Sequence, residues 1–297
     1  MSGYDRTMPW QEVGDRVYRH RYNSFDLNVG AVVGDDQVLV IDTRGWRAQA
    51  EELRRDLRLL SPLPWRQVVN THAHFDHCFG NELFRGAAIW GHERCADDLR
   101  TRGEEQRANM MAGLPELADD LAQVEIVPPD NLVNERATLS VGGRKVELRY
   151  LGRGHTDNDL VLLVPDAGVV FAGDLVEEGA PPSYADSWPL EWPATVDRLL
   201  AIAPATVVPG HGDVIDHTFV RRQREELQAM AELCRQVARG ELAPQMGLAR
   251  APFAEREARL ALERARITWL QQEEAGLPGQ TGILVRYPIS GRIAPSR

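Results

Sequence analysis

Lysine is nearly absent from this chain of 297 residues. Only Lys145 occurs among its 34 basic residues, so every other one is arginine. Schiff-base and pyridoxal enzymes need a lysine amine, and a phosphate-binding P-loop needs Gly-Lys followed by Ser or Thr. Lys145 lies in Gly-Gly-Arg-Lys-Val-Glu, which fits neither requirement. The composition therefore argues against both classes of enzyme.

Cysteines and long apolar runs are scarce as well. The three cysteines, Cys78, Cys95 and Cys234, are odd in number and far apart, which does not fit a disulfide framework and favours a reducing compartment. No run approaches about 18 consecutive apolar residues, and the start, Met-Ser-Gly-Tyr-Asp-Arg, lacks the apolar core of a signal peptide. We therefore expect a cytoplasmic protein with no membrane span and no membrane partner.

The charge of the chain limits its partners. The formal net charge is −10 at pH 7. Because nucleic acids attract basic surfaces, we expect no nucleic-acid partner and instead a small-molecule substrate. The same charge argues mildly against strongly anionic substrates.

Strand-like and helix-like segments alternate along the first two thirds of the chain. Residues 160–164 and 169–172 are continuous apolar runs, which predict strands that are buried on both faces and need helices as cover. Residues 47–60 repeat apolar side chains at helical spacing and predict a helix between two strands. The sequence thus predicts an α/β (α+β) fold.

Two segments depart from this alternation. Residues 92–127 are polar and predict a helical insertion, which is either a lid or a surface excursion. After His217 the composition becomes helical, with two apolar stripes separated by a break over residues 240–252. We assign residues 1–217 to the main domain and 218–297 to a helical C-terminal extension, which either completes the core or forms the face of a homodimer.

Three of the eight histidines fall within Thr71-His72-Ala73-His74-Phe75-Asp76-His77, directly after an apolar segment. In an extended turn His72 and His74 point to one side, whereas Asp76 and His77, at the start of a helix, project differently. Imidazole and carboxylate are the usual ligands of Zn²⁺. One short segment can therefore serve two metal ions.

Three later residues of ligand type each follow a predicted strand. His155 lies in Gly-His-Thr, Asp174 ends the run Val-Val-Phe-Ala-Gly-Asp, and His211 lies in Pro-Gly-His-Gly. Alone, each signal is weak, because an aspartate after a strand is usually a turn or cap residue.

Together these motifs resemble the metallo-β-lactamase superfamily, whose order is His-x-His-x-Asp-His, Gly-His-Thr, Gly-Asp and Gly-His. The pattern spans about residues 17–213. The resemblance implies a four-layer αββα sandwich and a metal-dependent hydrolase. It also implies that one metal is bound by His72, His74 and His155, that the other is bound by Asp76, His77 and His211, and that Asp174 bridges the two.

The chemistry of such a pair is direct. Two zinc ions about 3.5–4 Å apart can share a water and lower its pKa from about 15.7 towards about 7. The metal-bound hydroxide would attack a small-molecule ester, lactone, thioester or amide. Asp76 is the catalytic residue that would orient this nucleophile or move a proton to the leaving group. Iron and manganese suit the same ligands, so zinc is the expected but not the only candidate metal.

Further residues are expected around the metals. A ligand histidine needs an acceptor for its second ring nitrogen, and Asp42, at the end of the apolar run 38–41, is the candidate, with a strand-end cap as the alternative. We expect Tyr184, Trp188 and Trp192 to line the substrate pocket, although core packing is an equal alternative for the tryptophans. Arg153, beside His155, is the candidate to hold an anionic substrate.

Several branches of the superfamily can be compared with these residues. The best-known β-lactam-hydrolysing class has a lysine three residues after the bridging position, whereas this chain has Glu177, which would repel a substrate carboxylate. A second reading is a mononuclear iron oxygenase of the persulfide dioxygenase kind, which would use His72, His155 and Asp174. A third is a non-catalytic metal-binding protein. The complete second ligand set favours the dinuclear hydrolase.

Overall fold

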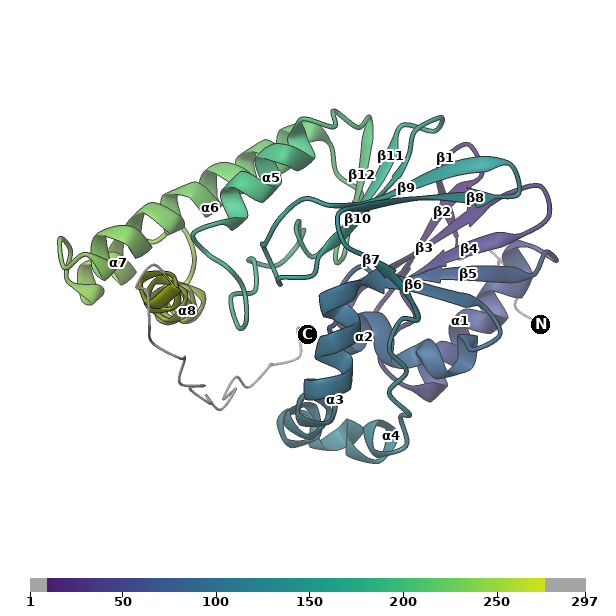
Figure 1. The fold of residues 1–297 in the computed structure, drawn as a ribbon, viewed down its shortest axis with the longest axis horizontal. Helices are drawn as coiled ribbons and strands as arrows, with labels where there is room; N and C mark the ends of the chain where they lie inside the picture. Colours follow the sequence, from purple (N-terminus) through teal and green to yellow (C-terminus); the bar gives the residue numbers. More distant parts are fainter. Residues whose placement is uncertain (1–9, 276–297) are drawn as a thin grey trace, which may run out of the picture.

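The structure is a computed structural model that describes residues 10–275. Two β-sheets pack face to face, and helices cover the outer face of each sheet (Figure 1). The layers therefore follow the order helix, sheet, sheet, helix. This arrangement confirms the predicted αββα sandwich.

Within the described residues the first sheet has seven strands, in the order in which they occur in the chain. The first four strands are antiparallel neighbours, and the pairs from β4 to β7 are parallel. Parallel neighbours need a crossover, and the predicted helix over residues 47–60 makes the first of them. The strands are β1 (Gln11–Gly14), β2 (Val17–Tyr22), β3 (Leu27–Val33), β4 (Val38–Ile41), β5 (Trp65–Val69), β6 (Ala88–His92) and β7 (Asn131–Val133).

The second sheet has five strands within the same residues, in the spatial order β12-β11-β10-β9-β8. Strands β8 to β11 form an antiparallel meander, and β12 is parallel to β11. The strands are β8 (Arg136–Val141), β9 (Arg144–Tyr150), β10 (Leu160–Val164), β11 (Val169–Gly173) and β12 (Thr206–Pro209).

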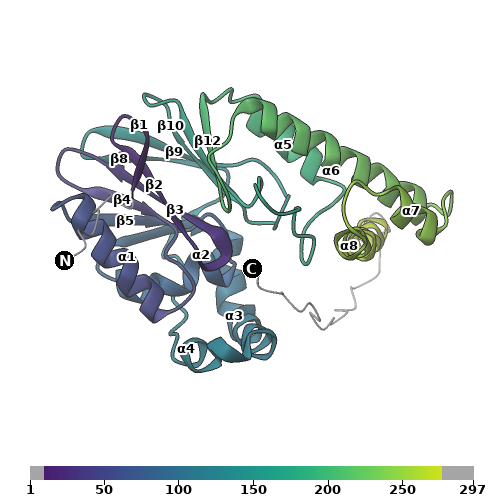
Figure 2. The same ribbon diagram turned by 180° about the vertical axis from the view of Figure 1, so that it is seen from behind.

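The helices fall into two groups on opposite sides of the sandwich (Figures 1 and 2). On the side of the first sheet lie α1 (Arg47–Leu60), α2 (Phe75–Cys78), α3 (Glu93–Gly113) and α4 (Ala118–Ala122). On the side of the second sheet lie α5 (Trp192–Leu200), α6 (His217–Ala238), α7 (Pro244–Arg250) and α8 (Glu255–Ala275). Short 3-10 helices cover Ser24–Asp26, Phe79–Phe84 and Pro115–Leu117.

Strand β10 shows why its sequence is apolar throughout. Leu160, Leu162 and Val164 lie in the core between the sheets, whereas Val161 and Leu163 lie in the core beneath the second group of helices. Successive side chains of a strand point to opposite faces, so both faces of β10 are buried.

The two segments that depart from the alternation are helical. The insertion contains α3 and α4, and α6 begins at His217, where the helical extension was predicted to start. Val220 and Met230 of α6 share a buried core with Val170 of the second sheet, so this helix is part of the outer layer. The predicted break over 240–252 is wrong in part: residues 244–250 form α7, because Pro244 suits the first turn of a helix.

No helix among residues 10–275 is long and apolar enough to cross a bilayer.

Candidate metal centre

The seven candidate ligands gather at one edge of the sandwich because each follows the end of a strand. The loop after β5 carries two histidines, and the start of α2 adds an aspartate and a third histidine. The second sheet supplies the remaining residues after β9, β11 and β12. The residues in this order are His72, His74, Asp76, His77, His155, Asp174 and His211.

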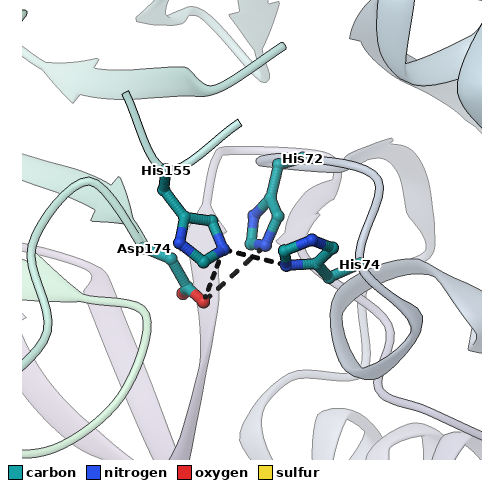
Figure 3. Close-up of side chains that lie close together, drawn as sticks. All are labelled: His72, His74, His155 and Asp174. Atoms are coloured by element: carbon teal, nitrogen blue, oxygen red, sulfur yellow. Dashed lines mark hydrogen bonds and ion pairs between the residues drawn. The ribbon is translucent and has the colours of Figure 1, made fainter. Parts of the chain in front are cut away.

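The first cluster consists of His72, His74, His155 and Asp174, whose ligand atoms all lie within 4.8 Å of one another. Nδ1 of His74 lies 2.8 Å from Nε2 of His155. Oδ2 of Asp174 lies 3.4 Å from Nε2 of His155 and 3.7 Å from Nε2 of His72. Figure 3 shows these side chains pointing towards one another.

The second cluster consists of Asp76, His77 and His211, again within 4.8 Å of one another. The Nε2 atoms of His77 and His211 are 3.3 Å apart, and Oδ2 of Asp76 lies 3.7 Å and 3.6 Å from them. Asp174 also reaches this cluster, with Oδ1 3.3 Å from Nε2 of His77 and Oδ2 3.2 Å from Nε2 of His211. Asp174 thus lies between the clusters.

These atoms fit a bound metal better than they fit one another. Nε2 of His72 is buried and has no hydrogen-bond partner among the described residues. A buried polar atom without a partner is costly, and imidazole nitrogens that face each other at 2.8 Å and 3.3 Å need a proton or a cation between them. Nitrogen and carboxylate donors in this arrangement are suited to zinc.

Asp42 hydrogen-bonds to His77 of the second cluster and is linked through Thr71 to His72 of the first cluster. Its buried carboxylate accepts from Nδ1 of His77 at 2.8 Å and from the backbone N–H and hydroxyl of Thr71 at 2.8 Å each. The Thr71 hydroxyl oxygen lies 3.0 Å from Nδ1 of His72. Because that hydroxyl donates to Asp42, it accepts from His72, which directs Nε2 of both histidines into the centre.

Other outer partners were missed by the sequence analysis. Nε2 of His74 lies 3.1 Å from Oδ2 of Asp186, and Nδ1 of His211 donates to the carbonyl of Phe25 at 2.7 Å. Nδ1 of His155 lies 3.7 Å from Oε1 of Glu177, whose carboxyl group is buried. No local pattern marks a carbonyl or a loop carboxylate as such a partner.

The carboxylates set the charge preference of the site. Burial opposes protonation of His74, but the neighbouring Asp186 outweighs it and raises the pKa of His74 to about 9. For His211 burial is likewise outweighed, here by Asp174, and the pKa rises to about 10. At His155 burial prevails and lowers the pKa to about 4. The negative field around the clusters therefore favours a cation.

Gly210 is required by the close approach of two loops. A Cβ atom at this position would lie 1.8 Å from Oδ1 of Asp174. The N–H of Gly210 donates to the carbonyl of Gly173 at 2.9 Å, which joins the ends of β12 and β11. The glycine before His211 thus allows Asp174 to occupy its place between the clusters.

The expectations for substrate-binding residues need correction. Tyr184 and Trp192 are 1% and 0% exposed and lie in the core beneath α5 and α6, so they do not line a pocket. Trp192 begins α5 and donates from its indole to the carbonyl of Leu175 at 3.1 Å. Trp188 is half-buried, and the guanidinium carbon of Arg153 lies 4.0 Å from the centre of its ring.

The sequence model of the metallo-beta-lactamase superfamily matches residues 25–233. Metallo-beta-lactamase type 2 from Bacteroides fragilis is 30% identical over 131 residues, which are 40% of this chain and 50% of that protein. Acyl-coenzyme A thioesterase MBLAC2 from Bos taurus is 26% identical over 238 residues, which are 71% of this chain and 82% of that protein. The chain spans about half the length of the first curated relatives it matches.

Solved structures agree on the fold. A metallo-beta-lactamase from Pontibacter korlensis superposes with a TM-score of 0.57 at 22% identity and covers 74% of this chain and 98% of its own. The matched range of the family model contains all seven candidate ligands and both sheets from β3 onward. The chain therefore belongs to the metallo-beta-lactamase superfamily.

Proposed function

We propose that this protein is a dinuclear zinc-dependent hydrolase that cleaves a small-molecule ester or thioester, with lactones and amides as related acyl substrates. The observation that carries the proposal is the meeting of the two donor clusters at Asp174, whose oxygens lie 3.2–3.4 Å from ring nitrogens of His77, His155 and His211.

When bound, zinc lowers the pKa of water towards about 7 and polarises a carbonyl. Asp76 supplies the proton transfer. Its Oδ2 faces the ring nitrogens of His77 and His211 at 3.7 Å and 3.6 Å, so its carboxylate can orient the attacking water, accept its proton and deliver that proton to the leaving group. Asp76 is thus proposed both as a ligand in the second cluster and as the catalytic residue.

The outer partners keep the donor nitrogens in place. Asp42, Asp186 and the Phe25 carbonyl each occupy the ring nitrogen that faces away from the centre. A fixed tautomer leaves the inward nitrogen with its lone pair available, so little reorganisation precedes metal binding. Such preorganisation suits a catalytic site.

Two observations favour the ester and thioester end of this range. The relative named as an acyl-coenzyme A thioesterase aligns with 71% of this chain, whereas the Bacteroides lactamase aligns with 40%. Position 177 also offers no cation for a β-lactam carboxylate, because Glu177 carries a carboxyl group, which is buried 3.7 Å from Nδ1 of His155.

A mononuclear iron oxygenase is the second candidate. It would use His72, His155 and Asp174 and would leave Asp76, His77 and His211 without a task. The close packing of those three around a common point supports the dinuclear hydrolase instead.

The test is elemental analysis of protein purified without added metal, followed by a panel of esters, thioesters, lactones and amides. We expect about two zinc ions per chain and turnover of at least one acyl substrate. H72A and D174A should abolish turnover, whereas H217A, a histidine at the start of α6 and outside both clusters, should not. One iron per chain without hydrolysis would contradict the proposal.

A further inference from the structure

Three arginines from distant parts of the chain converge on one loop beside His74. Arg102 comes from α3, Arg153 from the loop between β9 and β10, and Arg264 from α8. The loop they share, residues 186–188, lies between β11 and α5. Figures 1 and 2 show α3 and α8 in the two opposite groups of helices, so this loop is reached from both sides of the sandwich.

Short contacts link these arginines to the metal centre. Nε of Arg264 donates to the carbonyl of Ser187 at 2.7 Å, and its guanidinium carbon lies 5.6 Å from the ring centre of Trp188. Nη2 of Arg102 lies 3.9 Å from Oδ2 of Asp186, and the same oxygen lies 3.1 Å from Nε2 of His74. A group bound at the arginines would therefore lie on the outer side of His74, next to the first cluster.

The three guanidinium groups differ in their counterions. Nε of Arg102 pairs with Asp98 at 2.8 Å, and Nη1 of Arg153 faces Glu191 at 3.5 Å. The side chain of Arg264 makes no ion pair within 4.0 Å in the described part of the chain, and Nε is the one nitrogen of its guanidinium with a hydrogen bond there. Its two terminal amino groups are thus available to a ligand.

The surroundings of Arg264 are unfavourable for an uncompensated charge. Burial lowers its pKa, the negative charge of Asp186 opposes this effect in part, and the positive charge of Arg102 adds to it. A partly buried cation is costly when no anion accompanies it. The terminal amino groups of a guanidinium form a planar fork that matches a carboxylate or a phosphate with two hydrogen bonds.

On the basis of the proposed hydrolase function, we propose that Arg264, assisted by Arg102 and Arg153, binds an anionic group of the substrate beside the metal centre. The group is a carboxylate or a phosphate, since both fit the same fork. The three arginines place cationic groups at this loop, although the net charge of −10 by itself argued against anionic substrates. Positions 102, 153 and 264 are too far apart in the sequence for a motif to reveal them.

Two matched substrate pairs test the proposal and separate the two kinds of anion. S-acetyl-4′-phosphopantetheine and S-acetyl-pantetheine differ by one phosphate, and mono-4-nitrophenyl succinate and 4-nitrophenyl propionate differ by one carboxylate. For each pair we divide kcat/KM for the charged member by kcat/KM for the neutral member. In at least one pair R264L should lower this ratio at least tenfold, mainly by raising KM for the charged substrate. R264K, which keeps the charge but loses the fork, should lower it less.

The control is R259L, on the same helix, because Arg259 pairs with Glu255 at 2.5 Å away from the loop. It should leave both ratios unchanged, and circular dichroism should show that all variants fold. Equal losses for charged and neutral substrates in R264L would overturn the proposal, since Arg264 would then only support the loop that carries Asp186.

A binding experiment separates this proposal from the hydrolase proposal. The zinc-loaded wild type and R264L are titrated calorimetrically with succinate and with inorganic phosphate. We expect at least fivefold weaker binding of one of these anions to R264L, even if no substrate of the panel is hydrolysed. Unchanged affinity for both anions would overturn the anion site whatever the enzyme activity.

Discussion

At the scale of single residues, Asp42 shows how one carboxylate can organise both donor clusters. It is 2% exposed and accepts three hydrogen bonds, two from Thr71 and one from His77. Its backbone φ is +65°, a conformation that few residues other than glycine adopt. The turn after β4 is therefore strained in order to place this carboxylate.

We predict that D42N weakens zinc binding by about 10–100-fold, the usual effect of losing an outer partner. In one orientation the amide NH2 would face the Nδ1–H of His77, and in the other it would face the backbone N–H of Thr71, so a donor would oppose a donor in both. Competition with a chromophoric chelator measures the affinity. D36N, an exposed aspartate in the turn after β3, is the matched control and should bind zinc as the wild type does. Equal affinities in D42N and D36N would contradict the role of Asp42.

The burial of Tyr184 and Trp192 leads to a second prediction. The Tyr184 hydroxyl is buried and has no hydrogen-bond partner among the described residues, so Y184F should keep or raise the free energy of unfolding. W192A should lower it by about 3–5 kcal/mol, as expected for a large aromatic ring removed from a core. Urea denaturation measures both. A W192A variant with wild-type stability and altered substrate kinetics would instead support a pocket residue.

At the scale of elements, the beginning of α3 depends on an uncharged histidine. Nδ1 of His92 accepts from the backbone N–H of Arg94 at 3.0 Å and caps the helix. Burial and the charge of Arg94 lower the pKa of His92 to about 4 from 6.5. A protonated Nδ1 cannot accept this hydrogen bond, so the cap exists only in the neutral form.

This cap predicts a specific pH dependence of stability. The unfolded chain binds a proton at His92 below about pH 6.5 and the folded chain only near pH 4, so the free energy of unfolding should fall as pH decreases between these values. H92N keeps an accepting oxygen but does not titrate. Urea denaturation of the wild type and H92N between pH 4 and 7 measures their free energies of unfolding. The difference between the two free energies should change with pH, and a constant difference would contradict the prediction.

The elements also show what the sequence can and cannot predict. Residues 47–60 and 160–164 form the expected helix and strand because their apolar spacing depends on local burial alone. The gathering of the seven candidate ligands could be predicted because each follows a strand in a recognisable order. Asp186 and Arg264 could not, because their roles arise from contacts across 112 and 77 residues. Pockets and cores both favour aromatic rings, so the sequence left Trp192 open between the two and placed Tyr184 wrongly.

At the scale of the whole molecule, the C-terminal helices are part of the core. Ala258, Ala261 and Ala265 of α8 are 0–1% exposed and share a buried cluster with Leu227 and Met230 of α6. Small side chains allow the two helices to pack closely. The stripe of alanines that predicted a core or dimer face thus packs against α6 of the same chain.

A chain ended after Arg250 tests this arrangement. This shortened chain lacks α8, so the apolar side of α6 is uncovered. We expect Tm to fall by about 5 °C or more, since each kcal/mol of lost stability lowers Tm by about 2–4 °C. Differential scanning calorimetry measures Tm, and size-exclusion chromatography reports the oligomeric state. An unchanged Tm accompanied by the loss of a dimer would show that α8 serves an interface instead.

The position of His211 depends on the strand at the opposite end of the chain. Asn28 of β3 donates from its side chain to the carbonyls of Pro209 and Gly212 at 3.0 Å and 2.9 Å, and its backbone N–H donates to Gly210 at 2.8 Å. During synthesis, residues 72–77 leave the ribosome long before His211, which follows β12, has been made. Contacts so distant in sequence form late in folding. The order of translation would thus delay the binding of a metal at the second cluster until His211 has emerged.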